Sequence, residues 1–148
     1  VDADWFYHTF SSFMGGRLGR RLIRKYNFFA RTVVRAVFGD KEKLTPEIRR
    51  HIETPLADPE ERKGCWVFPG QIVGAREWLS SIWERRSALR GKIPLIVWGM
   101  KDLAFREKEL NRWTEEFPEG KVVRLSEVGH YVAEESPETL AGEIEALG

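Results

Sequence analysis

The chain has 148 residues, of which 42% are hydrophobic, 32% are charged and 12% are aromatic. This length suits about one average domain, and the composition excludes a disordered chain and favours a packed core or an apolar pocket. The net charge of +1 gives no overall electrostatic reason to bind nucleic acid or an acidic partner.

Features that bear on cellular location favour a reducing compartment. Cys65 is the single cysteine, so an internal disulfide cannot form. The sequence has no run of 18 apolar residues and no secretory signal pattern at its start. We therefore expect a cytoplasmic protein that does not interact with a membrane.

The first part of the chain is predicted to be helical. Aromatic residues cluster at positions 5–13, and the pair Gly15-Gly16 ends that segment. Between residues 17 and 38 apolar residues recur at helical spacing, with arginines and lysines between them. This pattern predicts one or two helices, with Asn27 as the expected break.

Signals for helix starts and ends follow. Thr45-Pro46 combines an N-cap residue with a proline in the first turn, and Pro55 is expected to end that helix. Asp58-Pro59 repeats the start signal. Phe68-Pro69-Gly70 is expected to break the chain, and we place the boundary between two regions of the protein shortly after it.

The two regions are residues 1–74, which are helical, and residues 75–148, in which helices and strands alternate. The pattern in the second region predicts helices over 75–89, 107–117 and from 137 onward, and strands over 93–98 and 122–125. The run at 93–98 is almost continuously apolar, which is typical of a parallel strand buried on both faces. The second region is therefore a βαβ unit with flanking helices. A stable sheet needs about three strands, so the remaining strands are missing or come from another chain.

Two residues that can carry catalysis follow the two predicted strands. Asp102 comes after the first strand and His130 after the second. Because parallel strands end at the same edge of a sheet, we expect the two side chains to meet there. An acid beside a histidine fixes the tautomer of the imidazole and stabilises its protonated form. Asp102 could instead only cap the loop that follows it, and His130 could be a surface histidine.

The motifs around these residues resemble the C-terminal part of the haloalkane dehalogenase group of α/β-hydrolases. They comprise Ile96-Val97-Trp98-Gly99-Met100-Lys101-Asp102-Leu103-Ala104-Phe105, the segment Trp113 to Pro118, Gly129-His130-Tyr131, Glu134-Glu135 and Pro137. Leu44-Thr45, Pro55-Leu56 and Phe68-Pro69 are more loosely similar to the helical cap of that group. The resemblance implies an α/β fold: the C-terminal part of an α/β-hydrolase, with a helical cap over 1–74 followed by the parallel βαβ unit and a terminal helix.

The resemblance also implies an activity. In this family an aspartate nucleophile displaces halide from a small apolar substrate such as a halogenated alkane, and a histidine then activates water to hydrolyse the alkyl-enzyme ester. Asp102 matches the position of the triad acid and His130 that of the general base, and no cofactor is implied. Epoxide or ester hydrolysis on the same scaffold is the alternative reaction.

The family's nucleophile motif, Gly-x-[Asp/Ser]-x-Gly after a strand, is absent from the sequence. We therefore expect that the N-terminal half of the hydrolase core is needed for a complete site, and that this chain alone is inactive. The rival of a different class is a non-catalytic polypeptide, either an inactive fragment or a helical binding module that uses the basic stretch at 17–35.

Further residues have both a functional and a structural interpretation. Phe105, Tyr131 and Trp5 are candidates for lining the apolar substrate pocket, although core packing explains them as well. His8, His51 and Cys65 are interpreted as residues without a catalytic role. The acids Glu134 and Glu135 are expected near the N-terminus of the last helix, where the helix dipole favours negative charge.

Overall fold

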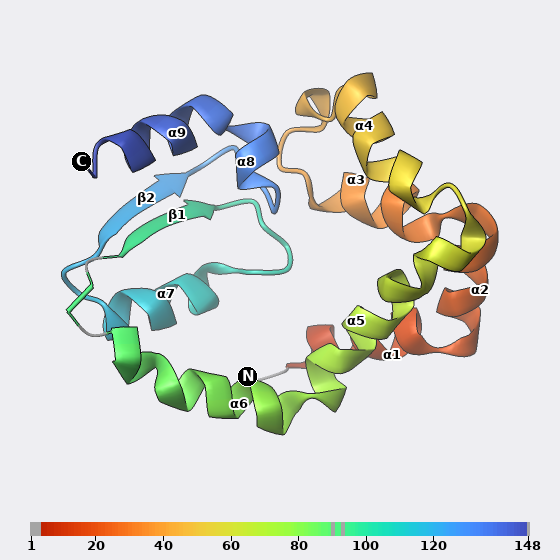
Figure 1. Ribbon diagram of the computed structural model, residues 1–148, viewed down its shortest axis with the longest axis horizontal. Coiled ribbons are helices and arrows are strands. Elements are labelled where there is room, and N and C mark those ends of the chain that lie inside the picture. Colours follow the sequence, from red (N-terminus) through yellow and green to blue (C-terminus); the bar gives the residue numbers. More distant parts are fainter. Residues whose placement is uncertain (1–3, 90, 93, 148) are drawn as a thin grey trace. The chain divides into compact units, whose positions relative to one another are not determined.

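Helices make up most of the molecule, and a short parallel sheet lies in its second half (Figure 1). The structure is a computed structural model that describes residues 4–89, 91–92 and 94–147. Its contacts divide the chain into two units, one of which comprises the residues up to Thr32 together with His51–Gly91. The other comprises Val33–Arg50 and the chain from Lys92 onward. The division at 74/75 predicted from the sequence concerns cap and core regions, and it stays a prediction.

The helical part of the chain contains α-helices joined by shorter π and 3-10 turns. The α-helices are α1 Trp5–Gly15, α2 Arg17–Tyr26, α3 Val34–Val37, α4 Pro46–Glu53, α5 Gly64–Gly74 and α6 Arg76–Glu84. The shorter turns are η1 Phe29–Val33 (a π-helix) and the 3-10 helices η2 Lys41–Lys43, η3 Thr54–Leu56, η4 Pro59–Lys63 and η5 Arg85–Leu89. Among the described residues, no helix is both long enough and apolar enough to cross a bilayer.

The first unit is held together by the packing of α1 against α5. The Ser11 hydroxyl donates a hydrogen bond to the Gly70 carbonyl at 3.3 Å. Gly15 lies beside Gly70, where a Cβ on Gly15 would stand 3.7 Å from the Gly70 Cα. Met14 and Ile23 are fully buried in this unit. Small residues at the crossing let the two backbones approach closely, while the larger apolar side chains fill the core.

Asn27 ends α2 as the sequence predicted. Its backbone adopts the left-handed conformation, with φ of 53°, which asparagine tolerates better than most residues. Its side-chain amide donates to the Leu56 carbonyl at 3.1 Å, so a hydrogen bond links the end of α2 to η3. The N-cap prediction at Thr45 is also confirmed, because its hydroxyl accepts from the amide of Ile48 at 3.2 Å.

The predicted break at Phe68-Pro69-Gly70 is wrong. Helix α5 runs through Pro69 from Gly64 to Gly74. A proline inside a helix removes one backbone hydrogen bond, and here that loss is offset because Pro69 is buried in the helical packing. A local sequence signal cannot weigh a lost hydrogen bond against tertiary contacts.

The predicted helix at 75–89 is shorter than expected. Helix α6 ends at Glu84, and the following residues form the 3-10 turn η5. Trp78 and Ile82, two members of its apolar stripe, are exposed. The spacing of the apolar residues identifies the stripe, but burial also requires a surface that packs on it.

The second unit contains the predicted βαβ arrangement. Strand β1 Leu95–Gly99 pairs in parallel with β2 Lys121–Leu125, in a register that sets Gly99 opposite Leu125. Helix α7 Glu107–Glu116 connects the strands, and α8 Val132–Glu135 and α9 Pro137–Glu145 follow. Helix α7 lies on one side of the sheet and α9 on the other (Figure 1). Ile93, the first residue of the predicted strand, lies outside the described residues.

The buried apolar side chains of this unit come from α7, from its C-terminal end and from segments outside the sheet. Leu110 on α7 and Phe117 at its C-cap are buried, and Trp113 on the same predicted face is half-buried. Val34, Phe38 and Val128 are also buried in this unit. The predicted helix and the burial of Leu110 and Phe117 are therefore confirmed.

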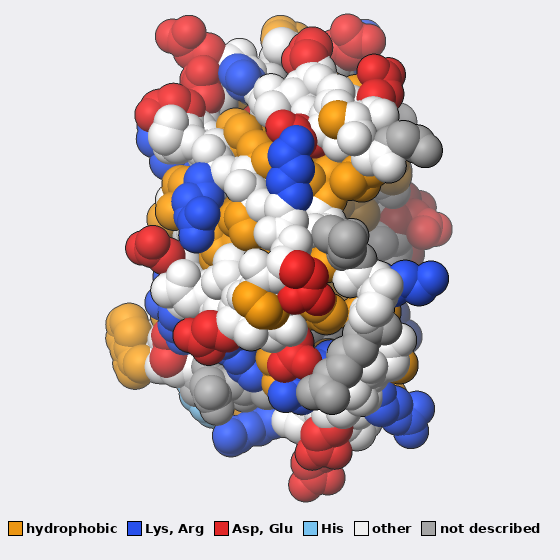
Figure 2. All heavy atoms as spheres, turned by 90° about the vertical axis from the view of Figure 1, so that its left-hand side faces the viewer, with side chains coloured by type: hydrophobic (Ala, Val, Ile, Leu, Met, Phe, Trp, Pro, Cys, Tyr) orange, Lys and Arg blue, Asp and Glu red, His pale blue; other side chains and the backbone are white. Residues whose placement is uncertain are grey.

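The expectation that the first strand is buried on both faces is wrong for this structure. Leu95 to Trp98 are only half-buried, and Gly99 alone is buried. Within the described residues the sheet has two strands, which leave backbone edges and part of each face uncovered. Figure 2 shows apolar side chains that reach the surface between charged ones on one face of the molecule.

Candidate functional site

The two strands end side by side, and their following loops are joined by backbone hydrogen bonds. The Met100 amide donates to the Leu125 carbonyl and the Lys101 amide to the Val128 carbonyl, each at 2.9 Å. Asp102 and His130 belong to these two loops. The parallel register therefore brings together residues that are far apart in the sequence.

Asp102 and His130 are in direct contact. The Asp102 Oδ2 lies 2.9 Å from the His130 Nδ1. The carboxylate is nearly buried, with 8% of its side chain exposed, whereas the imidazole is 31% exposed. A carboxylate oxygen accepts hydrogen bonds, so Nδ1 carries a proton in this pair, and in the neutral imidazole Nε2 then keeps a lone pair.

The second carboxylate oxygen of Asp102 holds its own loop. Oδ1 accepts from the amide of Ala104 at 2.7 Å and from that of Phe105 at 3.0 Å. The loop-capping interpretation of Asp102 and its pairing with histidine are therefore both present in one side chain. These bonds fix the carboxylate in the orientation that faces His130.

The contact with Asp102 changes the acidity of the imidazole. The hydrogen bond to Asp102 raises the pKa of His130 above its ordinary value of 6.5. Partial burial opposes this effect, and the negative charges of Asp102 and Glu135 add to it. A more basic imidazole is a better proton acceptor when a reaction produces an acidic proton beside it.

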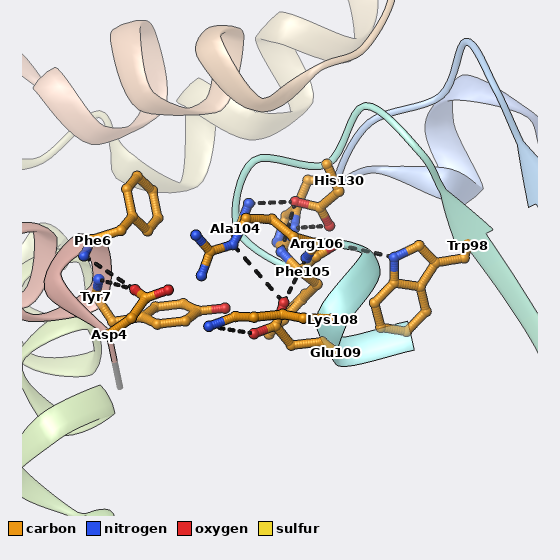
Figure 3. Close-up of polar contacts among 11 residues, drawn as sticks. Asp4, Phe6, Tyr7, Trp98, Ala104, Phe105, Arg106, Lys108, Glu109 and His130 are labelled. Atoms are coloured by element: carbon orange, nitrogen blue, oxygen red, sulfur yellow. Dashed lines mark hydrogen bonds and ion pairs between the residues drawn. The ribbon is translucent and has the colours of Figure 1, made fainter. Parts of the chain in front are cut away.

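Two aromatic rings lie beside the imidazole. The Phe105 ring stacks on His130 with 5.3 Å between ring centroids, and the Tyr131 ring stands edge-on at 5.4 Å. Figure 3 shows His130 with the Phe105 loop, whose backbone carbonyl accepts from the Trp98 indole N–H at 3.0 Å. Two of the three predicted pocket residues thus contact His130, and their role toward a substrate stays a prediction.

Other residues singled out from the sequence lie elsewhere. Trp5 begins α1 in the first unit and is exposed. Cys65 is half-buried in the same unit, and burial raises the pKa of its thiol. His51 is exposed. No cluster of three or more potential metal ligands occurs among the described residues.

Glu135 lies directly before the N-cap of the last helix, near its N-terminus as predicted. It is the last residue of α8, with 1% of its surface exposed. Its carboxylate accepts from the amides of Gly39, Asp40 and Gly129. Nothing in the sequence distinguishes it from its exposed neighbour Glu134.

Comparisons with known proteins show which family the chain resembles. No family model matches the chain. It is 30% identical over 138 residues to proteins named haloalkane dehalogenase 2 from Mycobacterium bovis and Mycobacterium tuberculosis. The alignment covers 92% of this chain and 48% of each relative. The chain is a haloalkane dehalogenase homologue. It spans about half the length of the curated relatives it matches.

Solved structures of haloalkane dehalogenases share the fold of this homologue. The enzyme DatA from Agrobacterium tumefaciens C58 matches with a TM-score of 0.76 and 19% identity, over 97% of this chain and 51% of that one. A loop variant of DbeA from Bradyrhizobium elkanii matches with a TM-score of 0.77 and 17% identity, over 99% and 51%. The predicted fold class, the C-terminal part of an α/β-hydrolase, is confirmed.

Proposed function

We propose that this chain supplies the histidine base and its acid partner to a hydrolase that cleaves carbon–halogen bonds in small apolar substrates such as halogenated alkanes. The observation that carries the proposal is the 2.9 Å contact between the Asp102 carboxylate and the His130 imidazole. The similarity to proteins named haloalkane dehalogenase supports the choice of reaction.

In the first step, an aspartate nucleophile from outside these 148 residues attacks the carbon that bears the halogen. A carbon–oxygen bond forms, and the halide leaves with the electron pair of the broken carbon–halogen bond. This step gives an alkyl-enzyme ester and needs no proton. The imidazole of His130 and its contact with Asp102 act in the step that follows.

In the second step, Nε2 of His130 takes a proton from a water molecule, and the oxygen of that water attacks the ester carbonyl. The ester opens to release an alcohol and restore the aspartate carboxylate. Asp102 stabilises the imidazolium formed in this step and keeps Nε2 facing the reaction. The proton then passes from His130 to the departing alkoxide, and the second proton of the water, left on the new carboxyl group, is released to solvent, so the site returns to its starting state.

The rest of the site belongs, in this proposal, to the N-terminal half of the hydrolase core. The two-stranded sheet with its half-buried β1 supports the need for further strands. The apolar rings of Phe105 and Tyr131 beside His130 suit an apolar substrate.

The test replaces the base in a polypeptide that joins this chain to the N-terminal half of the core. His130→Gln is expected to lower steady halide release from a primary bromoalkane by about 10³-fold or more, since water is no longer activated. A single burst of halide should remain, together with an enzyme whose mass has increased by one alkyl group. Halide release is measured by ion chromatography and the adduct by intact-protein mass spectrometry.

His51→Gln is the matched control, because His51 is an exposed histidine of the first unit and should leave turnover unchanged. Undiminished steady turnover in His130→Gln would contradict the assignment of the base. Turnover of esters or epoxides with no halide release from bromoalkanes would replace the reaction but keep the base.

A further inference from the structure

The buried Glu135 carboxylate accepts hydrogen bonds from three backbone amides of the second unit. Its Oε1 accepts from the Gly129 amide at 3.0 Å. Its Oε2 accepts from the Gly39 amide at 2.8 Å and from the Asp40 amide at 3.0 Å. Burying a carboxylate is costly unless hydrogen bonds replace its hydration, so these three amides define where Glu135 can lie.

The amides that Glu135 binds come from two segments that cross next to His130. Gly129 precedes His130 directly, and the His130 amide itself donates to the Val37 carbonyl at 2.9 Å. A Cβ on Gly129 would lie 2.3 Å from the Val37 oxygen and 2.4 Å from the Gly39 nitrogen. The two backbones therefore touch, with no room for side chains between them.

We propose that Glu135 is a positioning residue for His130: it clamps the loop that carries the histidine onto the segment Val37–Asp40, and thereby holds the imidazole against Asp102. One oxygen binds the histidine loop and the other binds the facing segment, so a single side chain fixes the distance between them. The inference rests on the proposed function only in taking His130 to be the base.

The charge of Glu135 also affects the imidazole, because it favours the protonated form of His130. Its negative charge helps to raise the pKa of His130, after the larger effect of Asp102. The charged groups around the clamp are Lys43, whose ammonium donates to the Glu135 backbone carbonyl, and Asp40 and Lys101, which interact with each other electrostatically. The ring neighbours of His130, Phe105 and Tyr131, carry no charge at neutral pH.

The test compares Glu135→Gln with the wild-type 148-residue chain by NMR. Glutamine keeps the size but has only one acceptor oxygen, so it cannot satisfy both segments. We expect the pKa of His130 in the folded variant to fall by roughly half a pH unit or more. We also expect the amides of Gly39, Asp40 and Gly129 to exchange with solvent about tenfold faster or more.

Glu134→Gln is the matched control, because it removes the same charge one residue away at an exposed position. It should leave both the pKa of His130 and the three exchange rates unchanged. Glu135→Asp, which keeps the charge and both oxygens, should restore part of the wild-type pKa. A purely structural Glu135 would lower the thermal midpoint of Glu135→Gln without moving the pKa of His130, and that result overturns the proposal.

Hydrogen exchange in the wild-type chain tests the clamp even where a variant does not fold. The proposal requires the three amides to be protected together, so unprotected exchange at any of them overturns it. None of these measurements needs substrate. A failed clamp with a working base in the halide assay refutes only this inference, whereas an intact clamp with undiminished turnover in His130→Gln refutes only the proposed function.

Discussion

Asp102 performs two tasks with its two carboxylate oxygens. One oxygen binds the amides of its own loop, and the other binds His130. Its place just after a strand was visible in the sequence, as was the place of His130. The contact between them was inferred from the parallel arrangement and is observed at 2.9 Å. The clamp by Glu135 could not be predicted, because burial of one of two adjacent glutamates depends on contacts about 95 residues away.

The pH dependence of stability is a prediction at this scale. Because the pKa of His130 is raised in the folded protein, the protonated histidine stabilises the fold. This contribution is fully present below the ordinary value of 6.5 and is lost as the pH rises through the folded pKa. The excess free energy of unfolding of the wild type over His130→Gln should therefore be larger at about pH 5.5 than at about pH 9.

Urea unfolding at the two pH values measures this difference. His51→Gln provides the control for losing an exposed histidine. An excess that stays constant, or that grows toward alkaline pH, would show that the Asp102 contact does not favour the protonated imidazole.

At the scale of elements, the apolar patterns predicted which faces can pack, and the fold decided which of them do. Leu110 on α7 and Phe117 at its C-cap are buried, as their spacing indicated. Helix α6 and helix α9 have similar stripes, yet Trp78, Ile82 and Ile144 are exposed. Burial requires a partner surface, and periodicity within one helix carries no information about that partner.

The buried face of α7 gives a prediction about stability. Leu110→Ala should lower the free energy of unfolding by about 2–5 kcal/mol, because it leaves a cavity under the helix. Leu110 is 0% exposed, whereas Leu147 is 55% exposed. Leu147→Ala should therefore change the same quantity by only about 0.5 kcal/mol. Denaturant unfolding at neutral pH compares the two, and equal losses would mean that the packing of α7 contributes little.

At the scale of the molecule, the chain folds into two compact units. Its described residues contain one sheet of two strands. Both halves of the proposed acid–base pair belong to the second unit, together with Glu135 and the segment that it binds. The hydrogen bonds described above for Asp102, His130 and Glu135 therefore join residues of one unit.

This organisation predicts that the 148-residue chain forms the acid–base pair but has no activity. The 148-residue chain alone should release no halide from a primary bromoalkane above background, because the proposed nucleophile is not in it. The same sample should still show an elevated pKa of His130 by NMR titration. Halide release that disappears in His130→Gln would instead reveal a nucleophile within this chain.

The sequence by itself determined the order of elements in the second half, the capping residues Thr45 and Asn27, and the positions of Asp102 and His130 after the two strands. Each of these depends on spacing or on local backbone chemistry, which a sequence displays directly. The tertiary structure decided the passage of α5 through Pro69, the incomplete burial of β1 and the role of Glu135. These depend on which distant groups come into contact, and the free energy of such contacts exceeds the local preferences that a sequence pattern records.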